Sequence, residues 1–369
     1  MTLKYNAIVR ELREQKKEVT TLSSGEVSFQ IPLFSFSELP IESLYNYSDS
    51  RGILALRKKI SAYYEKEYGV RSRPETELLV SAGSKIIIYM ALSAVLNPGE
   101  EVIVFEPAWV SYEEQIRLCR GVPVMVPYNE GVADIKKYIT EKTKVIIVNN
   151  PTNPSGKVYT REELQALYEE AMRNDVFLIS DEAYSDFTLE GEPFISMGTL
   201  DEKKERVIII NSMSKSFGVY GWRVGYVIAN PQIINLILKI NQHLVTCAPT
   251  VIQQYVEHHF EKFLEVVRPQ IRETIQKRQE VSKYMEEIGL FRLPGTGTFY
   301  FFISIEGSKL RSEEFAMQLL QKYSVSTVPG IGYGKSVDRF LRVGIGAANK
   351  EQIKKGLQAI KTFIDETHE

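Results

Sequence analysis

The chain has 369 residues, and its 45 basic and 47 acidic side chains leave a formal net charge of -2. This balance argues against an electrostatic nucleic-acid binder or a basic membrane-surface protein. No apolar run approaches the roughly 20 residues of a membrane span, and the charged first 19 residues lack the apolar centre of a signal peptide. Two cysteines exclude a disulfide scaffold, and the four histidines show no metal-ligand spacing. We therefore expect a soluble, cytoplasmic, two-lobed protein with no metal site and no nucleic-acid or membrane partner.

Short apolar runs recur through the first two thirds of the chain. They are Glu101–Phe105, Lys144–Asn149, Val176–Ser180, Arg206–Asn211 and Val224–Ala229. Each run is continuously apolar rather than alternating, which is typical of strands buried on both faces. Helical patterns separate the runs, and the clearest starts with a capping box at Thr160–Glu163. This alternation predicts an α/β lobe with a mostly parallel sheet flanked by helices.

The pattern changes beyond residue 268. Arg268–Pro269 predicts the start of a long helix to about Ile288, because proline does little harm in a first turn. The elements expected after it are a strand at Thr298–Ile303, a helix at Ser312–Leu320, a strand at Leu341–Ile345 and a helix from Lys350. They predict a smaller α+β lobe, which an N-terminal helix joins. We expect the large domain at residues 37–280 and the small domain at residues 1–36 and 281–369.

Chemically capable side chains follow the predicted strands, where ligands bind in parallel sheets. Lys215 follows one strand, between the hydroxyls of Ser212 and Ser214, and Arg223 comes shortly after. Hydroxyls and a guanidinium form a phosphate-binding set, and a lysine among them is a candidate Schiff-base nucleophile. Lys215 taken alone is better explained as an exposed loop residue.

The neighbouring strand ends favour the functional interpretation. Asp181 could cap a helix, but an Asp facing a pyridinium nitrogen near a lysine is the protein side of pyridoxal phosphate chemistry. Two X–Pro steps and Gly156 predict a tight turn that presents Asn153. Ser84 and Lys85 open a predicted helix, whose free N–H groups can hold a phosphate.

In this order the motifs resemble the class I/II aminotransferases, which are fold-type I pyridoxal 5'-phosphate enzymes. The resemblance runs from about Leu22 to the C-terminus. The matching motifs are Y-x-x-x-x-G-x-x-x-L-R at Tyr47–Arg57, N-P-x-N-P-[ST]-G at Asn150–Gly156, D-E-x-Y at Asp181–Tyr184, S-x-S-K with G-x-R-x-G at Ser212–Gly225, and the closing arginine at Arg342. Where the family has G-E-P-D-F, this chain has G-E-V-S-F at Gly25–Phe29, without the proline. The segment before it is also shorter than in many relatives.

The resemblance implies a role for each matching residue. Lys215 forms the Schiff base with the cofactor and moves the substrate's proton, and Asp181 keeps the pyridine nitrogen protonated. Asn153 and Tyr184 hydrogen-bond the cofactor's 3'-oxygen, and the ring of Trp109 stacks on the pyridine. The phosphate is held by the backbone N–H groups of Ser84 and Lys85, by Ser212, Ser214 and Arg223, and by Tyr47 of a second subunit.

The same resemblance places the substrate. Arg342 and Asn153 bind its α-carboxylate, the backbone of Gly25 lies against it, and Trp109 borders it. Lys85 stands where some bacterial aspartate aminotransferases carry a lysine that reaches a distal carboxylate. An equally good interpretation is that Lys85 only opens a helix beside the phosphate.

The expected function is aminotransfer between an L-amino acid and a 2-oxo acid by ping-pong half-reactions, by a homodimer with shared active sites. One alternative is a C–S lyase or another eliminating enzyme of the same fold. Another is a non-catalytic regulator carrying an aminotransferase-like lobe, but the chain has no residues left over for a DNA-binding domain.

Overall fold

A seven-stranded sheet forms the centre of the larger lobe. The computed structural model describes residues 14, 18–39, 42 and 44–368, so most of the predicted N-terminal helix lies outside the described residues. The strands are β2 (Leu78–Ser81), β3 (Glu101–Phe105), β4 (Val122–Val126), β5 (Thr143–Asn149), β6 (Phe177–Asp181), β7 (Val207–Ser212) and β8 (Gly225–Ile228). Their order is β2-β8-β7-β6-β5-β3-β4, and β8 alone runs antiparallel to its neighbours. The predicted mostly parallel sheet is confirmed, and the two strands that the sequence did not predict lie at its edges.

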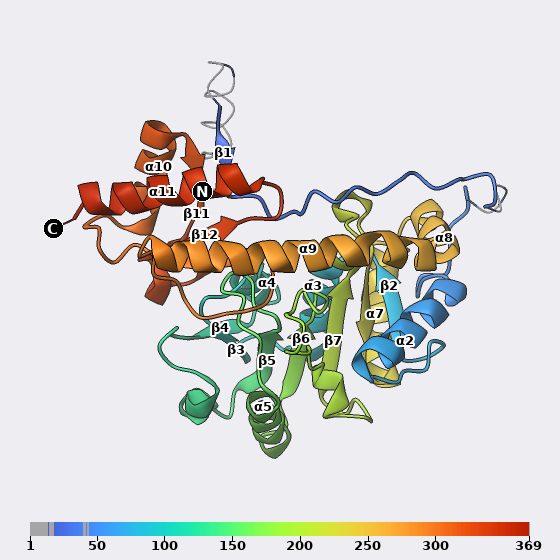
Figure 1. Cartoon of the computed structure of the whole chain (residues 1–369). Coiled ribbons are helices and arrows are strands. Elements are labelled where there is room, and N and C mark those ends of the chain that lie inside the picture. Colours follow the sequence, from blue (N-terminus) through green and yellow to red (C-terminus); the bar gives the residue numbers. More distant parts are fainter. Residues whose placement is uncertain (1–13, 15–17, 40–41, 43, 369) are drawn as a thin grey trace.

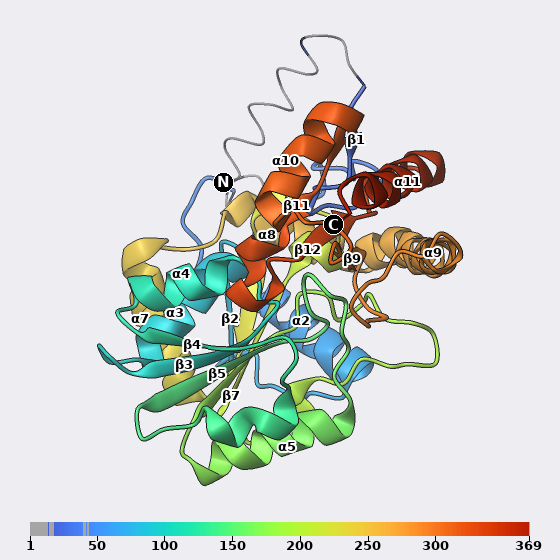
Figure 2. The same cartoon turned by 90° about the vertical axis from the view of Figure 1, so that its left-hand side faces the viewer.

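Helices cover both faces of this sheet (Figures 1 and 2). One face packs against α2 (Leu54–Tyr68), α5 (Arg161–Arg173) and α8 (Thr250–His258), and the other against α3 (Ser84–Val95), α4 (Ser111–Leu118) and α7 (Pro231–Leu244). The predicted capping box begins α5, because Thr160 Oγ1 accepts from Glu163 N and Glu163 Oε2 accepts from Thr160 N. In the part of the chain that is described, no helix has the length and apolarity needed to cross a bilayer.

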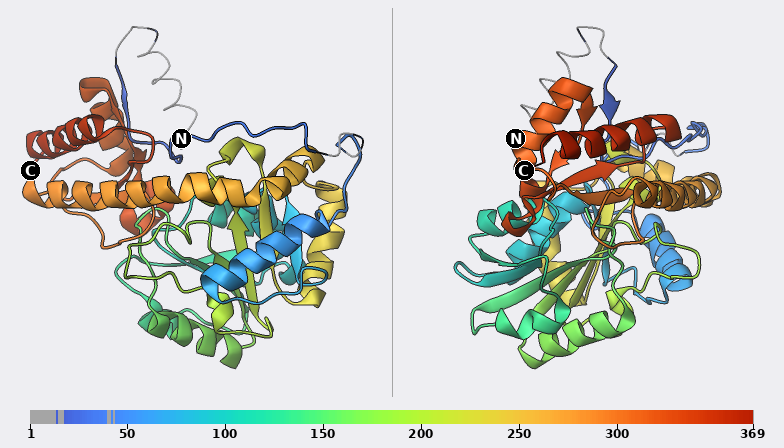
Figure 3. Two further views of the ribbon diagram at one scale, coloured as in Figure 1. Left: turned by 45° about the vertical axis from the view of Figure 1, so that its right-hand side comes forward. Right: turned by 60° about the vertical axis from the view of Figure 1, so that its left-hand side comes forward.

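The smaller lobe is built on an antiparallel sheet. Its strand order is β11 (Val328–Pro329), β12 (Phe340–Gly344), β9 (Tyr300–Ser304), and β1 (Thr20–Thr21) pairs separately with β10 (Val325–Ser326). The two helices α10 (Ser312–Tyr323) and α11 (Lys350–Glu366) pack on this lobe (Figure 3). The predicted α+β elements are therefore confirmed.

A long helix runs through both lobes, and its predicted start is wrong. Helix α9 spans Phe260–Glu287, so Pro269 lies in its interior rather than in its first turn. Proline removes one N–H···O bond there. The helix continues through it because buried residues lie on both sides, with Phe263 in the large-lobe core and Ile271 in the small-lobe core. The expected domain boundaries at residues 37 and 280 stay a prediction.

Candidate active site

The carboxyl ends of the central strands open into a cavity of about 630 Å³. It is lined by twelve of the thirteen predicted site residues, namely Gly25, Ser84, Lys85, Trp109, Asn153, Asp181, Tyr184, Ser212, Ser214, Lys215, Arg223 and Arg342. The remaining one, Tyr47, lies outside the cavity with 85% of its surface exposed. The fold thus brings together residues from both lobes, since Arg342 comes from β12 and most of the others from strand ends, helix starts and loops of the large lobe.

Lys215 lies in the short helix α6 (Met213–Ser216), directly after β7. Its Nζ donates to the backbone oxygen of Gly25 at 2.6 Å and lies 4.5 Å from the centre of the Tyr220 ring. Removal of the amine from water, together with the nearby positive charge of Arg342, lowers the pKa of Lys215 to about 7. The amine is therefore substantially uncharged at neutral pH, as a nucleophile or a proton acceptor must be.

Asp181 is the last residue of β6, and its carboxylate is buried. Oδ2 accepts from the hydroxyl of Tyr112 at 2.6 Å, and Oδ1 accepts from Ala183 N at 3.2 Å. Burial raises the pKa of Asp181, while these two hydrogen bonds and the charge of Lys215 oppose the rise. Both donors are neutral, so a cationic N–H partner in the cavity would stabilise the buried carboxylate.

The side chain of Asn149 fixes the turn that carries Asn153. The Asn149 side chain accepts from Asn153 N at 2.7 Å and donates to the backbone oxygen of Asp181 at 2.9 Å. Asn153 Nδ2 in turn donates to the Tyr184 hydroxyl at 3.4 Å. These hydrogen bonds hold the turn and the end of β6 together. Asn153 and Tyr184, which are predicted to hydrogen-bond the cofactor's 3'-oxygen, therefore lie close to each other.

Arg342 is buried and has no carboxylate partner among the described residues. Nη1 donates to Asn153 Oδ1 at 3.4 Å and Nη2 to the backbone oxygen of Ser23 at 2.9 Å, while Nε is buried without a partner. The ring of Tyr300 lies 4.4 Å from the guanidinium carbon. A buried guanidinium with donors left over is a site for a planar anion such as a carboxylate.

A second anion site is formed where α3 begins. Ser84 opens this helix, and the guanidinium of Arg223 lies beside Gly83, where a Cβ would come within 2.4 Å of Nη2. Arg223 Nη1 also contacts Ser214 Oγ at 3.5 Å, and Ser212 Oγ accepts from Ser214 N at 3.1 Å. A helix N-terminus, hydroxyls and a guanidinium together favour a phosphate.

Sequence reasoning did not assign roles to four polar residues of this site. They are Tyr112, which holds Asp181, Asn149, which holds the turn, Tyr220, whose hydroxyl accepts from Val27 N at 2.8 Å, and Tyr300, whose hydroxyl contacts Tyr184 and Gly25. Asn149 borders a matched motif and Tyr220 lies within one, but no sequence pattern marked Tyr112 or Tyr300.

The chain is similar to known aminotransferases over nearly its whole length. The family model described as aminotransferase class I and II matches residues 17–360. The (5-formylfuran-3-yl)methyl phosphate transaminase of Methanocaldococcus jannaschii is 36% identical over 97% of this chain and 95% of its own. The aspartate aminotransferase of Pyrococcus abyssi is 33% identical, covering 95% and 92%. The crystal structure of an aromatic aminotransferase from Pyrococcus horikoshii superposes with a TM-score of 0.87 at 30% identity, covering 97% and 99%.

The lowered pKa of Lys215 predicts unusual reactivity. In the cofactor-free protein, reductive methylation of Lys215 should rise with pH through a midpoint of about 7, because only the neutral amine reacts with formaldehyde. An ordinary exposed lysine, with a pKa near 10.4, should react slowly over this range. Peptide mass spectrometry after short labelling at pH 6, 7 and 8 measures both in one sample. A Lys215 profile parallel to that of the surface lysines would contradict this pKa.

Proposed function

Because the chain belongs to the class I and II aminotransferases, we propose that it uses pyridoxal 5'-phosphate, bound in this cavity with Lys215 as its Schiff-base lysine. The chain is an aminotransferase, which moves an amino group between an amino acid and a 2-oxo acid. The observation that carries the cofactor proposal is the placement of a lysine with a pKa of about 7, a buried aspartate and two anion sites around one cavity.

The side chains fit this cofactor group by group. The start of α3 at Ser84 and Lys85, with Ser212, Ser214 and Arg223, would hold the phosphate. Asp181, oriented by Tyr112, would hold the ring nitrogen in its protonated form, and Asn153 and Tyr184 would hold the 3'-oxygen. Trp109, from the loop before α4, would cover the ring. When bound, pyridoxal phosphate supplies an aldehyde carbon and a ring that accepts electrons.

Proton transfer is the task of Lys215. A group with a pKa of about 7 can both accept and return a proton at neutral pH. Its Nζ is directed toward Gly25, the residue whose backbone we propose to lie against the substrate. Arg342 would bind the α-carboxylate and so bring the substrate's reacting carbon toward the same part of the cavity.

Chemical trapping tests the cofactor assignment. Protein loaded with pyridoxal phosphate and reduced with borohydride should carry the reduced cofactor on Lys215, as peptide mass spectrometry detects. Lys215→Ala should lose all measurable aminotransfer, and Asp181→Asn should keep the trapped label but lose at least about a hundredfold in kcat, since the ring nitrogen loses its anionic partner. Label on another lysine, or turnover by Lys215→Ala, would contradict the assignment.

The substrate side chain would be selected at the mouth of the cavity. Lys85 is exposed there, with its Nζ 5.1 Å from the centre of the Trp109 ring. We propose that Lys85 binds the distal carboxylate of an acidic substrate, while the aromatic surface of Trp109 accepts an apolar one. The relatives named for aspartate and for aromatic amino acids support this range of side chains.

A panel of amino donors tests this proposal. Lys85→Ala should lower kcat/KM for aspartate or glutamate about tenfold to a hundredfold and change it little for phenylalanine, because one charged hydrogen bond is lost. Lys142→Ala, an exposed lysine outside the cavity, serves as the control. Equal losses for acidic and aromatic donors would contradict the role of Lys85. Release of ammonia without a matching amino-acid product would instead favour the eliminating enzyme.

We further propose a cytoplasmic homodimer in which Tyr47 completes the phosphate site of the partner. Tyr47, Tyr45 and Leu33 are 85%, 86% and 79% exposed, and so much aromatic and aliphatic surface favours an interface. The cysteines Cys119 and Cys247 are free, as is usual in a reducing compartment.

Mixing two damaged variants tests the shared site. Tyr47→Phe should weaken cofactor binding about tenfold through the lost hydrogen bond to phosphate, and Lys215→Ala should be inactive. A heterodimer of the two contains one site with both native residues, so mixed and reassociated subunits should regain tight cofactor binding in part of the sites. Fluorescence titration with pyridoxal phosphate measures this fraction. A titration equal to the sum of the two separate variants would contradict a shared site.

A further inference from the structure

A further contact between the two lobes lies at Glu106. This residue follows β3, and its side chain is buried. Its carboxylate accepts from Lys335 N at 3.1 Å, from Ser336 N at 2.9 Å and from the Ser336 hydroxyl. All three donors belong to the connection between β11 and β12 of the small lobe. This connection contains the short 3₁₀ helices η5 (Gly330–Tyr333) and η6 (Lys335–Val337). We call residues 333–336 the clasp segment.

The clasp segment is shaped to approach this carboxylate. Gly334 has φ +141°, a conformation that favours glycine, and a Cβ there would lie 2.2 Å from Glu106 Cδ. Two more hydrogen bonds reinforce the contact, from Ala108 N to the Tyr333 oxygen at 2.8 Å and from Tyr128 N to Ser336 Oγ at 3.1 Å. Both backbone and side-chain groups of the clasp segment therefore form hydrogen bonds with the large lobe.

On each side of this contact, a neighbouring residue lies close to the proposed substrate site. Tyr333 is buried, and its ring centre lies 5.6 Å from the guanidinium carbon of Arg342. On the other side, Ala108 directly precedes Trp109, which lines the site cavity. We propose that Glu106 is a positioning residue for substrate binding, which fixes Tyr333 and Arg342 of the small lobe relative to Trp109. This inference rests on the proposed binding of the α-carboxylate by Arg342.

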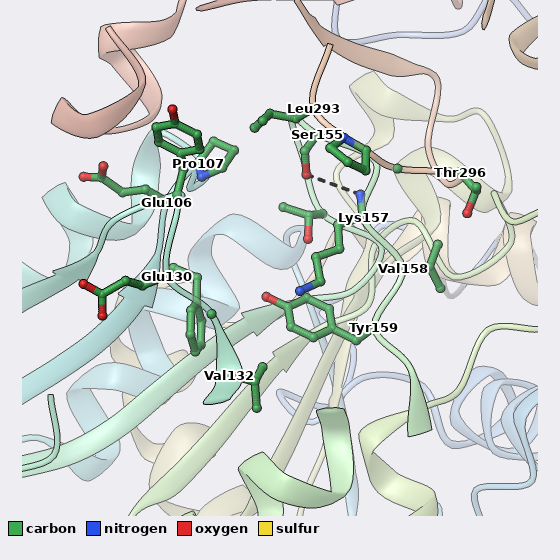
Figure 4. Close-up of a pocket in the computed structure, with 16 residues that line it drawn as sticks. Glu106, Pro107, Glu130, Val132, Ser155, Lys157, Val158, Tyr159, Leu293 and Thr296 are labelled. Atoms are coloured by element: carbon green, nitrogen blue, oxygen red, sulfur yellow. Dashed lines mark hydrogen bonds between the residues drawn. The ribbon is translucent and has the colours of Figure 1, made fainter. Parts of the chain in front are cut away.

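Hydrogen bonds from the clasp segment orient the Glu106 side chain. A separate cavity of about 430 Å³ lies on one side of this residue, lined also by Pro107, Tyr159 and Leu293 (Figure 4). The Glu106 carboxylate points away from Lys157 and Tyr159 on the far side of this cavity, and it accepts from the clasp segment instead. Glu130 lines the same cavity, but its carboxylate pairs with Lys137 of its own lobe at 3.3 Å. Glu130 is therefore the matched control.

The test compares Glu106→Gln with Glu130→Gln in the cofactor-loaded enzyme. The amide of Glu106→Gln presents one oxygen and one NH2 group to three donors, so at least one backbone N–H loses its acceptor. KM for both the amino acid and the 2-oxo acid should rise about tenfold, with kcat within about twofold and cofactor affinity unchanged. Gly334→Ala should give the same pattern from the opposite side, and Glu130→Gln should leave all three constants unchanged. An unchanged KM in Glu106→Gln, or equal losses of KM, kcat and cofactor affinity, would overturn the inference.

Two further variants separate this inference from the proposed function. Arg342→Lys should raise KM by itself. If it does not, the carboxylate role of Arg342 fails, whatever Glu106 does. Ser336→Ala removes the hydroxyl that donates to Glu106 and accepts from Tyr128 N, but it leaves both backbone donors to Glu106 in place. Its effect on KM should be smaller than that of Glu106→Gln, and it should be reduced in the Glu106→Gln background. Hydrogen exchange of the amides of Lys335 and Ser336 should also be faster in Glu106→Gln, and exchange at the wild-type rate would contradict the clasp.

Discussion

The site depends on the cationic side chains of Lys215, Arg223 and Arg342, which line one cavity together with the buried carboxylate of Asp181. Burial lowers the pKa of Lys215 most, and the charges of Arg342 and Arg223 lower it further. The carboxylates of Glu26 and Asp181 oppose this shift. Like charges in a poorly hydrated space repel, and lysine relieves the repulsion by losing its proton, because arginine keeps its charge at any physiological pH. The two arginines thus have two effects, since they provide anion sites and also add to the effect of burial that lowers the pKa of Lys215.

The sheet topology supplies this arrangement of charges. Asp181 and Lys215 follow the adjacent parallel strands β6 and β7, and Asn153 follows β5, so their side chains meet at one edge of the sheet. Arg223 reaches the same edge from the other direction, because β8 runs antiparallel and begins where β7 ends. Gly225, at the start of β8, lets the backbone come so close that a Cβ would lie 2.5 Å from Ser84 N.

The sequence predicted these residues because each stands at the end of an apolar run or within a matched motif. It did not assign Tyr112, Tyr220 and Tyr300, since a single tyrosine forms no pattern in the sequence and gains its role only from tertiary contacts. The predicted start of α9 was wrong for a related reason. Proline is a local signal, whereas the stripe of Phe260, Phe263, Val267 and Ile271 that carries the helix through Pro269 is stabilised by two separate cores. The edge strands β2 and β4 were not predicted. The apolar run of β2 has only three residues, and the run of β4 contains Pro123, which is rare inside a central strand.

The groups proposed to position the substrate come from both lobes rather than from one loop. Lys215 and the proposed phosphate site belong to the large lobe, and Arg342 belongs to the small lobe. A shift of about 1 Å between reacting groups is enough to cost a large part of the rate, so the contacts between lobes matter as much as the groups themselves. Helix α9 packs into the apolar cores of both lobes. The hydrogen bonds at Glu106 have defined directions and lengths, as do those from Arg342 Nη1 to Asn153 Oδ1 and from Gly297 N to the Gly156 oxygen. Together these polar contacts fix the position of one lobe relative to the other more narrowly than apolar packing does.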